Sequence, residues 1–273
     1  MNCQFHVIAL KTPIIHPGDD LTARLCDAAE IAGGFQDGDI LVIAESALAT
    51  AEGAVIRLSD VDPSQMAKSL GTTYEIDPQL AEIVLQESDS IAGGIPGHLL
   101  CFRNGTLLPN AGVDDSNAPP GTVVLLPKNP DGSATRIRLE IQTLTDMYLG
   151  IIVADSRTHA MRLGCSGVAI GASGFCGVGD ERGRADLFGR PLQVTRSAIA
   201  DNIASAAELV MGEADECIPA AIVRGLGLPI TEEEGIEGIE ASKCLFMGSA
   251  LNGYPARVGT EQDSGTLKKS PAR

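Results

Sequence analysis

The sequence predicts an α/β (α+β) fold in which mixed β-sheets are packed with helices. Short apolar runs rich in β-branched residues, such as 40–44 and 151–153, are typical of buried strands. Segments with apolar residues at helical spacing, such as 197–211, alternate with these runs. The Asn104-Gly105 dipeptide between two apolar runs predicts a β-hairpin that interrupts the alternation. A mixed sheet is therefore expected rather than a purely parallel one.

Turn signals and periodicity place the individual elements. Strands are expected at 3–10, 40–44, 99–102, 106–108, 122–126, 151–153, 192–195 and 218–224. Helices are expected at 21–32, 64–70, 78–87, from 130 to about 145, and at 197–211. The expected helix caps are Asp19 or Asp20, Ser64, and Asp131 or Ser133. Residues from about 253 to 273 are poor in apolar side chains and predict a flexible tail.

Composition and charge limit the classes of function. The 273-residue chain is 44% hydrophobic with only 3% aromatic residues, so an aliphatic core of ordinary size is expected. Its formal charge of −16 would repel the phosphates of nucleic acids and anionic lipids, so neither nucleic acid nor membrane is expected as a partner. No uninterrupted apolar run is long enough to cross a bilayer. A small anion held by a few arginines or by a metal is still compatible with this charge.

The cysteines and histidines exclude several kinds of site. Seven cysteines, an odd number without a CxxC pair, indicate reduced thiols in a cytoplasmic protein. The spacing of a zinc site and the HExxH pattern are both missing. The sequence also has no GxxxxGK[ST] loop, no GxGxxG turn after a strand and no GxSxG elbow. Because the N-terminus has no signal-peptide pattern either, we expect a cytoplasmic location.

The stretch from Gly150 to Gly177 is the most suggestive part of the chain. An expected strand, 151–153, runs into Ala154-Asp155-Ser156-Arg157, which places a carboxylate, a hydroxyl and a guanidinium just beyond a strand end. A run rich in Gly and Ala follows at 164–177, and small residues permit close approach of backbone to backbone or to a ligand. The structural alternative is a strand, a polar turn and a second buried strand.

Three separated loops carry carboxylates beside small or polar residues, at 110–117, 155–156 and 212–216. Hard cations such as Mg²⁺ or Mn²⁺ prefer oxygen ligands, often one or two carboxylates with phosphate oxygens and water. The loops could converge on such a site. Asp and Asn are also ordinary turn residues, which would explain the same loops without a metal.

Arginines are concentrated in a short span of this otherwise acidic chain. They are Arg157, Arg162, Arg182, Arg184 and Arg190. Guanidinium groups suit the bidentate recognition of phosphates and carboxylates, which favours an anion site. The alternative is surface salt bridging to neighbours such as Asp180, Glu181 and Asp186, and each such pair contributes little.

Several motifs taken together resemble the family of coenzyme F420-0:γ-glutamyl ligases. They are IIHPGDDL, DGDILVIAES, TAEG, NAGVDDSN, LLPKNPDGSA, the strand followed by Ala154-Asp155-Ser156, GVAIGASG and IASAAELVMGEA. In the order found in the family, these motifs and their neighbours cover nearly all of residues 5–226. The resemblance implies the α/β fold of this family, an intertwined homodimer and a catalytic domain that spans residues 1–252.

The resemblance also implies the chemistry. A ligase of this family joins the amine of L-glutamate to a carboxyl group of the lactyl-phospho-deazaflavin F420-0, driven by GTP. Mg²⁺ or Mn²⁺ is the implied cofactor, with K⁺ as a further candidate. The γ-phosphoryl group would move to the acceptor carboxylate, and the glutamate amine would then displace phosphate. Phosphoryl transfer of this kind depends mainly on positioning and on charge neutralisation.

The matched motifs imply the site residues as well. The metal ligands would be Asp114, Asp155, Ser156 and Glu213. Nucleotide contacts would come from Thr12, Pro13, Ile14, Ile15, Glu45, Ser46, Thr50, Asn117, Met211, Gly212, Ala214 and Ile218. Arg157 and Arg162 would be the catalytic arginines near the acceptor.

Departures from the family pattern leave the acceptor open. Thr50 stands where the family usually has a lysine that contacts the nucleotide, so a non-catalytic relative that binds a nucleotide or a deazaflavin is one alternative. Ser156 replaces a threonine and keeps its hydroxyl. The segment RTHAMRLG, 157–164, is more similar to a sister group linked to glutamylation of a folate or pterin, which is the second alternative.

Overall fold

The computed structural model describes residues 4–251 and divides the chain into two units, Met1–Glu237 and Gly238–Arg273. Each unit is described by itself. The second unit contains one described helix, α7 (Leu245–Leu251). The first unit contains the central sheet and the site, so the fold is built from that unit. In the described part of the chain, no helix combines the length and the apolar character needed to cross a membrane.

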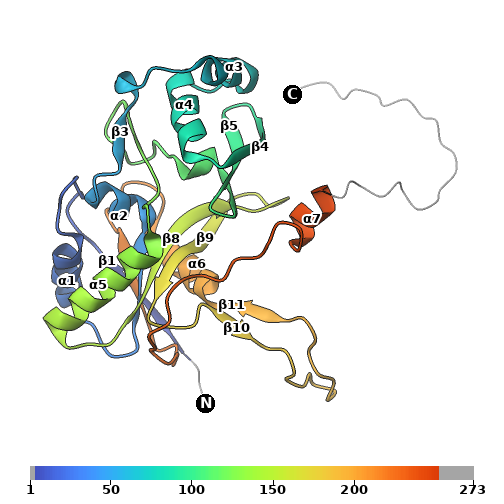
Figure 1. Ribbon diagram of the computed structural model, residues 1–273. Coiled ribbons are helices and arrows are strands. Elements are labelled where there is room, and N and C mark those ends of the chain that lie inside the picture. Colours follow the sequence, from blue (N-terminus) through green and yellow to red (C-terminus); the bar gives the residue numbers. More distant parts are fainter. Residues whose placement is uncertain (1–3, 252–273) are drawn as a thin grey trace, which may run out of the picture. The chain divides into compact units, whose positions relative to one another are not determined.

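A five-stranded mixed sheet forms the centre of the first unit (Figure 1). Its strand order is β1 (His6–Leu10), β12 (Ala220–Arg224), β2 (Ile40–Ala44), β8 (Gly150–Thr158) and β9 (Cys165–Ser173). Only the β2–β8 pair is parallel, and the other three pairs are antiparallel. Because β12 lies antiparallel between β1 and β2, the strands β1, β2 and β8 all point in one direction.

Helices cover both faces of this sheet. One face carries Leu41, Ile43, Ile151 and Val153, which pack against α1 (Leu21–Ile31) and α5 (Pro130–Thr145). The opposite face, with Ile40, Val42, Ile152 and Ala154, packs against α6 (Ile199–Met211). The alternation of side chains along β2 and β8 therefore supplies two aliphatic cores from the same strands. This explains why both strands are apolar throughout.

A second group of elements has its own apolar core. It contains α3 (Gln65–Tyr74), α4 (Pro78–Glu87) and a three-stranded sheet of β4 (Ser90–Ile95), β5 (His98–Arg103) and β6 (Thr106–Pro109). The strands β3 (Val55–Arg57) and β7 (Thr122–Val124) pair with each other beside the 3₁₀ turns η1 (Leu58–Asp60) and η2 (Asn110–Gly112). The helix α2 (Glu45–Ala51) leads from β2 into this group.

A hairpin of β10 (Val178–Asp180) and β11 (Arg196–Ala198) projects from the sheet layers (Figure 1). Its long loop exposes apolar side chains, with Leu187 99% and Phe188 82% exposed. The tip of the β8–β9 hairpin is similarly exposed at Met161 and Leu163. Side chains of this kind usually mark a contact surface when they gather on a projecting element.

Most predicted elements are confirmed, including the mixed sheet, the strand 40–44 and the Asn104-Gly105 hairpin. Asp20 and Ser64 cap their helices through bonds from the backbone N–H groups of Ala23 and Ala67. The first strand begins at His6, and residues 1–3 and the predicted tail 253–273 lie outside the described residues. The 1–252 domain and the homodimer stay predictions.

Several predictions about local structure are wrong or incomplete. The cap of α5 is Asn129, which accepts the N–H of Gly132 at 3.1 Å, because Asp131 instead accepts the N–H of Ala172 and Ser133 donates to Glu52. The strand expected at 192–195 is absent from the described structure, and β11 forms further on where a partner strand is available. The strands β3 and β4 had no clear alternation and were not predicted.

The strand predicted at 151–153 is also longer than expected. It continues to Thr158 because the Gly- and Ala-rich run returns as β9 and pairs with it along its whole length. Asp155 and Ser156 therefore lie within β8, beyond the last residue of its neighbour β2, rather than in a turn after a strand. The prediction of a second buried strand in this run is confirmed.

A buried ion pair ties the far ends of three strands together. Arg224 at the end of β12 donates to both carboxylate oxygens of Asp39 at 2.8 and 2.7 Å, and also to the carbonyl of Gly34 at 2.7 Å. The side chain of Asp39 is only 1% exposed, and its carbonyl accepts the N–H of Gly150 at the start of β8.

We predict that Arg224→Met lowers the free energy of unfolding by about 3 kcal/mol, because removing one partner leaves a buried, uncompensated carboxylate. Arg190→Met is the matched control, since it breaks an exposed pair with Asp186. Urea unfolding of both variants followed by circular dichroism measures the difference. Equal midpoints for the two variants would contradict the structural role of the Arg224–Asp39 pair.

Candidate active site

Chain segments that are far apart in the sequence meet at one edge of the central sheet. Leu10, Ala220, Ile43 and Val153 lie side by side across β1, β12, β2 and β8. The residues that follow β1, β2 and the parallel part of β8, and those that precede β12, must therefore emerge together. These positions include Thr12, Glu45 and Asp155 and the loop that ends at Ile218. Edges where parallel strands end are common ligand sites in α/β proteins.

Backbone hydrogen bonds fix two of these loops at the edge. The N–H of Thr12 donates to the carbonyl of Cys217 at 3.0 Å, and the N–H of Ala44 donates to the carbonyl of Pro219 at 2.9 Å. The segment Thr12–Ile15 and the loop from Met211 to Ile218, both predicted to bind the nucleotide, are thus neighbours. Cys217 holds a left-handed backbone conformation, with φ of 56°, which marks local strain in this loop.

Glu45 is the first residue of α2 and follows β2 without a linker. The pKa of its carboxyl is raised to about 8, mainly by burial and then by the charge of Asp155. The charge of Asp114 adds to this rise, and hydrogen bonds from the backbone N–H groups of Glu45 and Ser46 oppose it. The structure therefore brings Glu45, Asp155 and Asp114 close enough for their charges to interact. Sequence reasoning assigned Glu45 to the nucleotide, but did not predict its position among carboxylates.

Asp155 and Arg157 project from β8 and form an ion pair at 2.8 Å. Burial raises the pKa of Asp155, the neighbouring Arg157 partly lowers it, and Asp114 raises it. Strand alternation directs Ser156 to the other face of the sheet, towards α6, where its backbone partner is Gly167. The predicted metal ligands Asp155 and Ser156 thus serve opposite faces of the same edge.

A strained turn presents Asp114 from the second group of elements. Asn110, Ala111 and Gly112 all have left-handed φ values, 47°, 54° and 74°. The turn persists because the N–H of Leu99 donates to the Asn110 side chain and Arg103 donates to the carbonyl of Ala111. Asp114 pairs with Val124 of β7 and accepts the N–H and hydroxyl of Ser116. Strain held by its surroundings is common at functional sites.

Two further carboxyls come from the end of α6 and the loop after it: Glu208, which sequence reasoning missed, and Glu213. The pKa of Glu208 is raised to about 7, mainly by burial and then by the charge of Glu213 and a hydrogen bond with its carboxyl. The charge of Asp155 adds a smaller rise, and the backbone N–H of Gly167 opposes it. The only sequence signal for Glu208 is its position in the last turn of the amphipathic helix, five residues before Glu213.

Some predicted site residues do not lie beside the carboxylates of Glu45, Asp155 and Asp114. Arg162 lies in the exposed tip of the β8–β9 hairpin, beyond the last strand pair, Thr158–Cys165. Asn117 is exposed and has a left-handed backbone. Position 50, where the family usually has a lysine, is Thr50 in the last turn of α2. Their roles toward a nucleotide or acceptor stay predictions.

Salt bridging accounts for most of the arginine-rich span. Arg182 pairs with Asp180, Arg184 with Glu181 and Arg190 with Asp186, as the structural alternative predicted. Arg157 is the arginine of the group that lies at the carboxylates.

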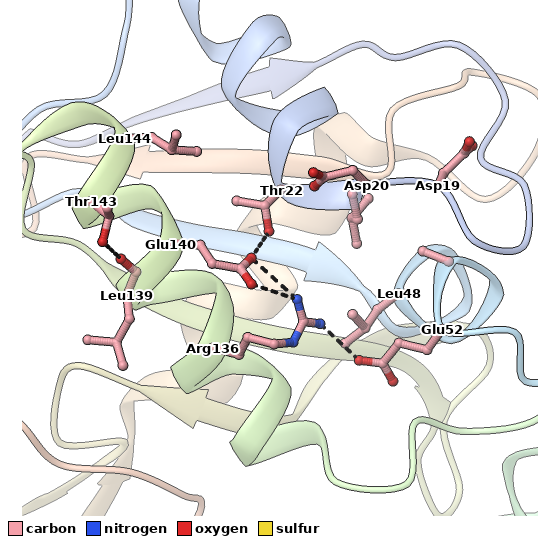
Figure 2. A pocket seen from close by; sticks show the side chains of 12 residues that line it. Asp19, Asp20, Thr22, Leu48, Glu52, Arg136, Leu139, Glu140, Thr143 and Leu144 are labelled. Atoms are coloured by element: carbon pink, nitrogen blue, oxygen red, sulfur yellow. Dashed lines mark hydrogen bonds and ion pairs between the residues drawn. The ribbon is translucent and has the colours of Figure 1, made fainter.

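A separate groove of about 670 Å³ lies between α1, α2 and α5 (Figure 2). Its polar lining is satisfied internally. Arg136 bridges Glu52 and Glu140 at 3.1 and 3.3 Å, and Thr22 donates to Glu140 at 2.5 Å. These bonds connect the three helices and so fix α2, whose other end carries Glu45.

The donor set at the sheet edge fits a hard divalent cation, since it consists of carboxylate and hydroxyl oxygens. Within residues 4–251, however, no three His, Cys, Asp or Glu side chains are already gathered closely enough to hold a metal ion. Asp155 is turned towards Arg157 and Asp114 is bonded to Ser116, which explains the open arrangement.

Comparison with known proteins identifies the family of the chain. The sequence matches the family described as F420-0:Gamma-glutamyl ligase over residues 9–225. It is 44% identical over 222 residues to a coenzyme F420:L-glutamate ligase of Methanopyrus kandleri, covering 81% of this chain and 86% of that protein. Proteins of the same name from Methanothermobacter thermautotrophicus and Methanocaldococcus jannaschii are 41% and 40% identical, over 78% and 84% of this chain and 85% and 91% of theirs.

The fold and the site define an α/β enzyme with an acidic site at the edge of its central sheet. The extent of the match and the identity to these relatives place it further: the chain belongs to the F420-0:γ-glutamyl ligase family. Members of this family are ligases, which confirms the resemblance carried by the sequence motifs.

The raised pKa of Glu45 predicts a pH-dependent stability. A carboxyl whose pKa is higher in the folded than in the unfolded protein holds its proton more tightly when folded. Stability is therefore lost as the pH rises from the ordinary value of 4.5 towards about 8. We predict that the melting temperature of Glu45→Gln falls less than that of the unmutated protein over this pH range, by several degrees. Thermal unfolding in the presence of a chelator measures the difference.

Glu30→Gln, at an exposed position of α1, is the matched control and should follow the unmutated protein across the same pH range. An unchanged pH profile for Glu45→Gln would show that Glu45 ionises normally and is not held among carboxylates.

Proposed function

We propose that this protein catalyses GTP-dependent formation of an amide bond between L-glutamate and the carboxyl group of F420-0. The relatives named coenzyme F420:L-glutamate ligase, each covering more than three quarters of this chain, carry the choice of reaction and acceptor. The observation that carries the assignment to a site is the convergence of Glu45, Asp155 and Asp114 at one sheet edge.

The reaction has two steps in this proposal. A carboxylate oxygen of the acceptor attacks the γ-phosphorus of GTP, which forms an acyl phosphate and releases GDP. The glutamate amine then attacks the acyl carbon, phosphate leaves, and the ammonium formed loses a proton to solvent. Mg²⁺ or Mn²⁺ supplies charge neutralisation for the transferring phosphoryl group.

The residues at the edge suit these requirements. Asp114 and Asp155 on one face of the sheet, and Ser156 and Glu213 on the other, would hold the cations. Arg157 pairs with Asp155 at 2.8 Å. If Asp155 held a cation, this guanidinium would be available for a phosphate or carboxylate oxygen, since Arg suits both anions.

The nucleotide would lie along the loops tied together by the Thr12–Cys217 hydrogen bond. Thr12 to Ile15, Glu45, Ser46 and the loop from Met211 to Ile218 line this part of the edge. Thr50 lacks the charge of the family lysine, so binding of the phosphates is expected to depend more on cations than on side chains. K⁺ is a further candidate cation, and Arg162 would meet the acceptor only if the hairpin tip bends towards the edge.

The proposal includes a homodimer in the cytoplasm. The exposed apolar side chains at the tips of the β10–β11 and β8–β9 hairpins, Leu187, Phe188, Met161 and Leu163, support contact with a second copy of the chain. Two projecting elements that each bear apolar tips are suited to an intertwined arrangement.

Mass spectrometry of the product tests the reaction. Incubation with GTP, Mn²⁺, L-glutamate and F420-0 should raise the acceptor mass by one glutamyl unit and release GDP. We predict that Asp155→Asn lowers the rate by about 100-fold or more while the melting temperature changes little, because the site loses a ligand charge but keeps its shape.

A parallel incubation with tetrahydrofolate addresses the similarity of segment 157–164 to the folate- and pterin-linked group. Glutamylation of tetrahydrofolate alone would move the assignment to that acceptor. An unchanged mass of both acceptors, with GTP still bound in calorimetry, would contradict catalysis and favour a nucleotide-binding protein.

A further inference from the structure

A row of polar side chains continues from Asp155 along the β8–β9 hairpin. Arg157 follows Asp155 by two residues on the same strand, so both side chains lie on one face of the sheet. Ser166 of β9 is the register partner of Arg157 and shares that face. His159, directly after β8, reaches the same face, because its Nε2 lies 2.6 Å from Oγ of Ser166. Three groups able to donate hydrogen bonds therefore lie beyond the Asp155 carboxylate.

Arg157 keeps donors that the protein does not use. Its side chain is only 13% exposed, and its Nε donates to Oδ2 of Asp155 at 2.8 Å. Among residues 4–251, no acceptor lies within hydrogen-bond distance of its two terminal nitrogens, Nη1 and Nη2. No buried side-chain nitrogen or oxygen in the same range lacks a partner, so these two nitrogens are open to solvent. A guanidinium held by one side thus presents the edge that binds carboxylates in a bidentate manner.

His159 fixes the Ser166 hydroxyl beside this edge. The N–H of Arg162 donates to the carbonyl of His159 at 3.1 Å, which closes the turn at the hairpin tip. When the imidazole proton is on Nε2, the ring donates to Oγ of Ser166 and leaves the hydroxyl proton for another acceptor. Ser166 is half-buried and His159 is exposed, so a small molecule has access to both.

We propose that Arg157 and Ser166 form a receptor for a substrate carboxylate on the β8–β9 hairpin, with His159 as the residue that orients the Ser166 hydroxyl. The inference rests on the proposed function, which supplies two substrates with carboxylates, L-glutamate and the acceptor. It adds Ser166 and His159, to which the sequence motifs assign no role.

The position of the receptor favours L-glutamate as the source of the carboxylate. The acceptor carboxylate must meet the transferring phosphoryl group, and hence the cations proposed at Asp155. Two residues along a strand cover about 6.8 Å, so Arg157 and Ser166 lie one step further out. The carboxylates of glutamate are separated from its attacking amine by the carbon chain, and this spacing suits a receptor one step from the reacting groups.

Steady-state kinetics of the full chain with GTP, Mn²⁺, L-glutamate and F420-0 tests the proposal. Ser166→Ala removes the hydroxyl and should raise the KM for L-glutamate about 10-fold, since a hydrogen bond to a charged group is lost. The kcat and the KM for GTP should change little. A rise in the KM for F420-0 instead would keep the receptor and assign it to the acceptor carboxylate.

The role of His159 has its own variants. His159→Ala should raise the same KM, and His159→Gln, which keeps a donor for the Ser166 hydroxyl, should restore most of it. The double variant Ser166→Ala/His159→Ala should be no worse than Ser166→Ala, because the two residues act as a unit. Additive losses in the double variant would contradict an action of His159 through Ser166.

Thr158→Ala is the matched control. Thr158 is an exposed hydroxyl residue of the same hairpin, but strand alternation directs it to the opposite face. Unmutated KM values are expected for this variant, and melting temperatures of all variants report on folding. Unchanged KM values for both carboxylate substrates in Ser166→Ala, or an equal rise in Thr158→Ala, would overturn the receptor.

The outcome for the receptor is separable from that for the proposed reaction. If the unmutated protein forms product and Ser166→Ala has unchanged KM values, the reaction stands and the receptor is rejected. If no product forms, calorimetric titration of L-glutamate into the protein with Mn²⁺ and GDP decides. Binding that Ser166→Ala weakens about 10-fold keeps the receptor without the reaction, whereas equal binding or no binding rejects it.

Discussion

Parallel pairing of β2 with β8 is the interaction on which the site depends. Ile43 lies beside Val153, so the residues that follow, Glu45 and Asp155, leave the sheet at the same edge. At the opposite end the pairing is fixed by Asp39, whose carbonyl binds the N–H of Gly150 and whose carboxylate binds Arg224 of β12. A slip of one residue would exchange the two faces of β8 and direct Asp155 towards α6. The ion pair at one end of the sheet therefore supports the strand register that places Glu45 and Asp155 at the other end.

Electrostatic repulsion at this edge is maintained by rigid surroundings. Burial and mutual repulsion raise the pKa values of Glu45, Asp155 and Glu208. Arg157 is the arginine that offsets part of this charge, and the strained turn at 110–112 holds Asp114 in reach. The buried carboxyls and the strained turn cost stability, and a cation bound among the carboxyls would offset part of that cost. The acidic edge is therefore suited to the proposed reaction, in which cations would accompany a phosphate-bearing substrate.

Much of the central sheet could be predicted from the sequence because its strands are short, apolar and bounded by turn residues, as in 40–44. The strand β8 was underestimated because Asp155, Ser156 and Arg157 look like a turn, and only tertiary pairing with β9 extends it to Thr158. The family motifs identified Asp114, Asp155, Ser156 and Glu213 as a group, and the structure brings them to one edge. Glu208 carried no motif, since its position depends on how closely Gly167 allows α6 to approach. The cap of α5 was misplaced for a similar reason, because Asp131 finds a partner in β9 instead.

The most direct test of the account is the location of the cation and nucleotide in crystals of the protein grown with Mn²⁺ and GDP. Anomalous scattering from Mn²⁺ should give density at the carboxyl ends of β2 and β8, between Asp114 and Asp155 and on the α6 side near Ser156. The GDP phosphates should lie beside the loops at Thr12 and Cys217. Mn²⁺ and GDP bound instead in the groove around Arg136, with no anomalous density at the sheet edge, would contradict the assignment of this edge as the active site.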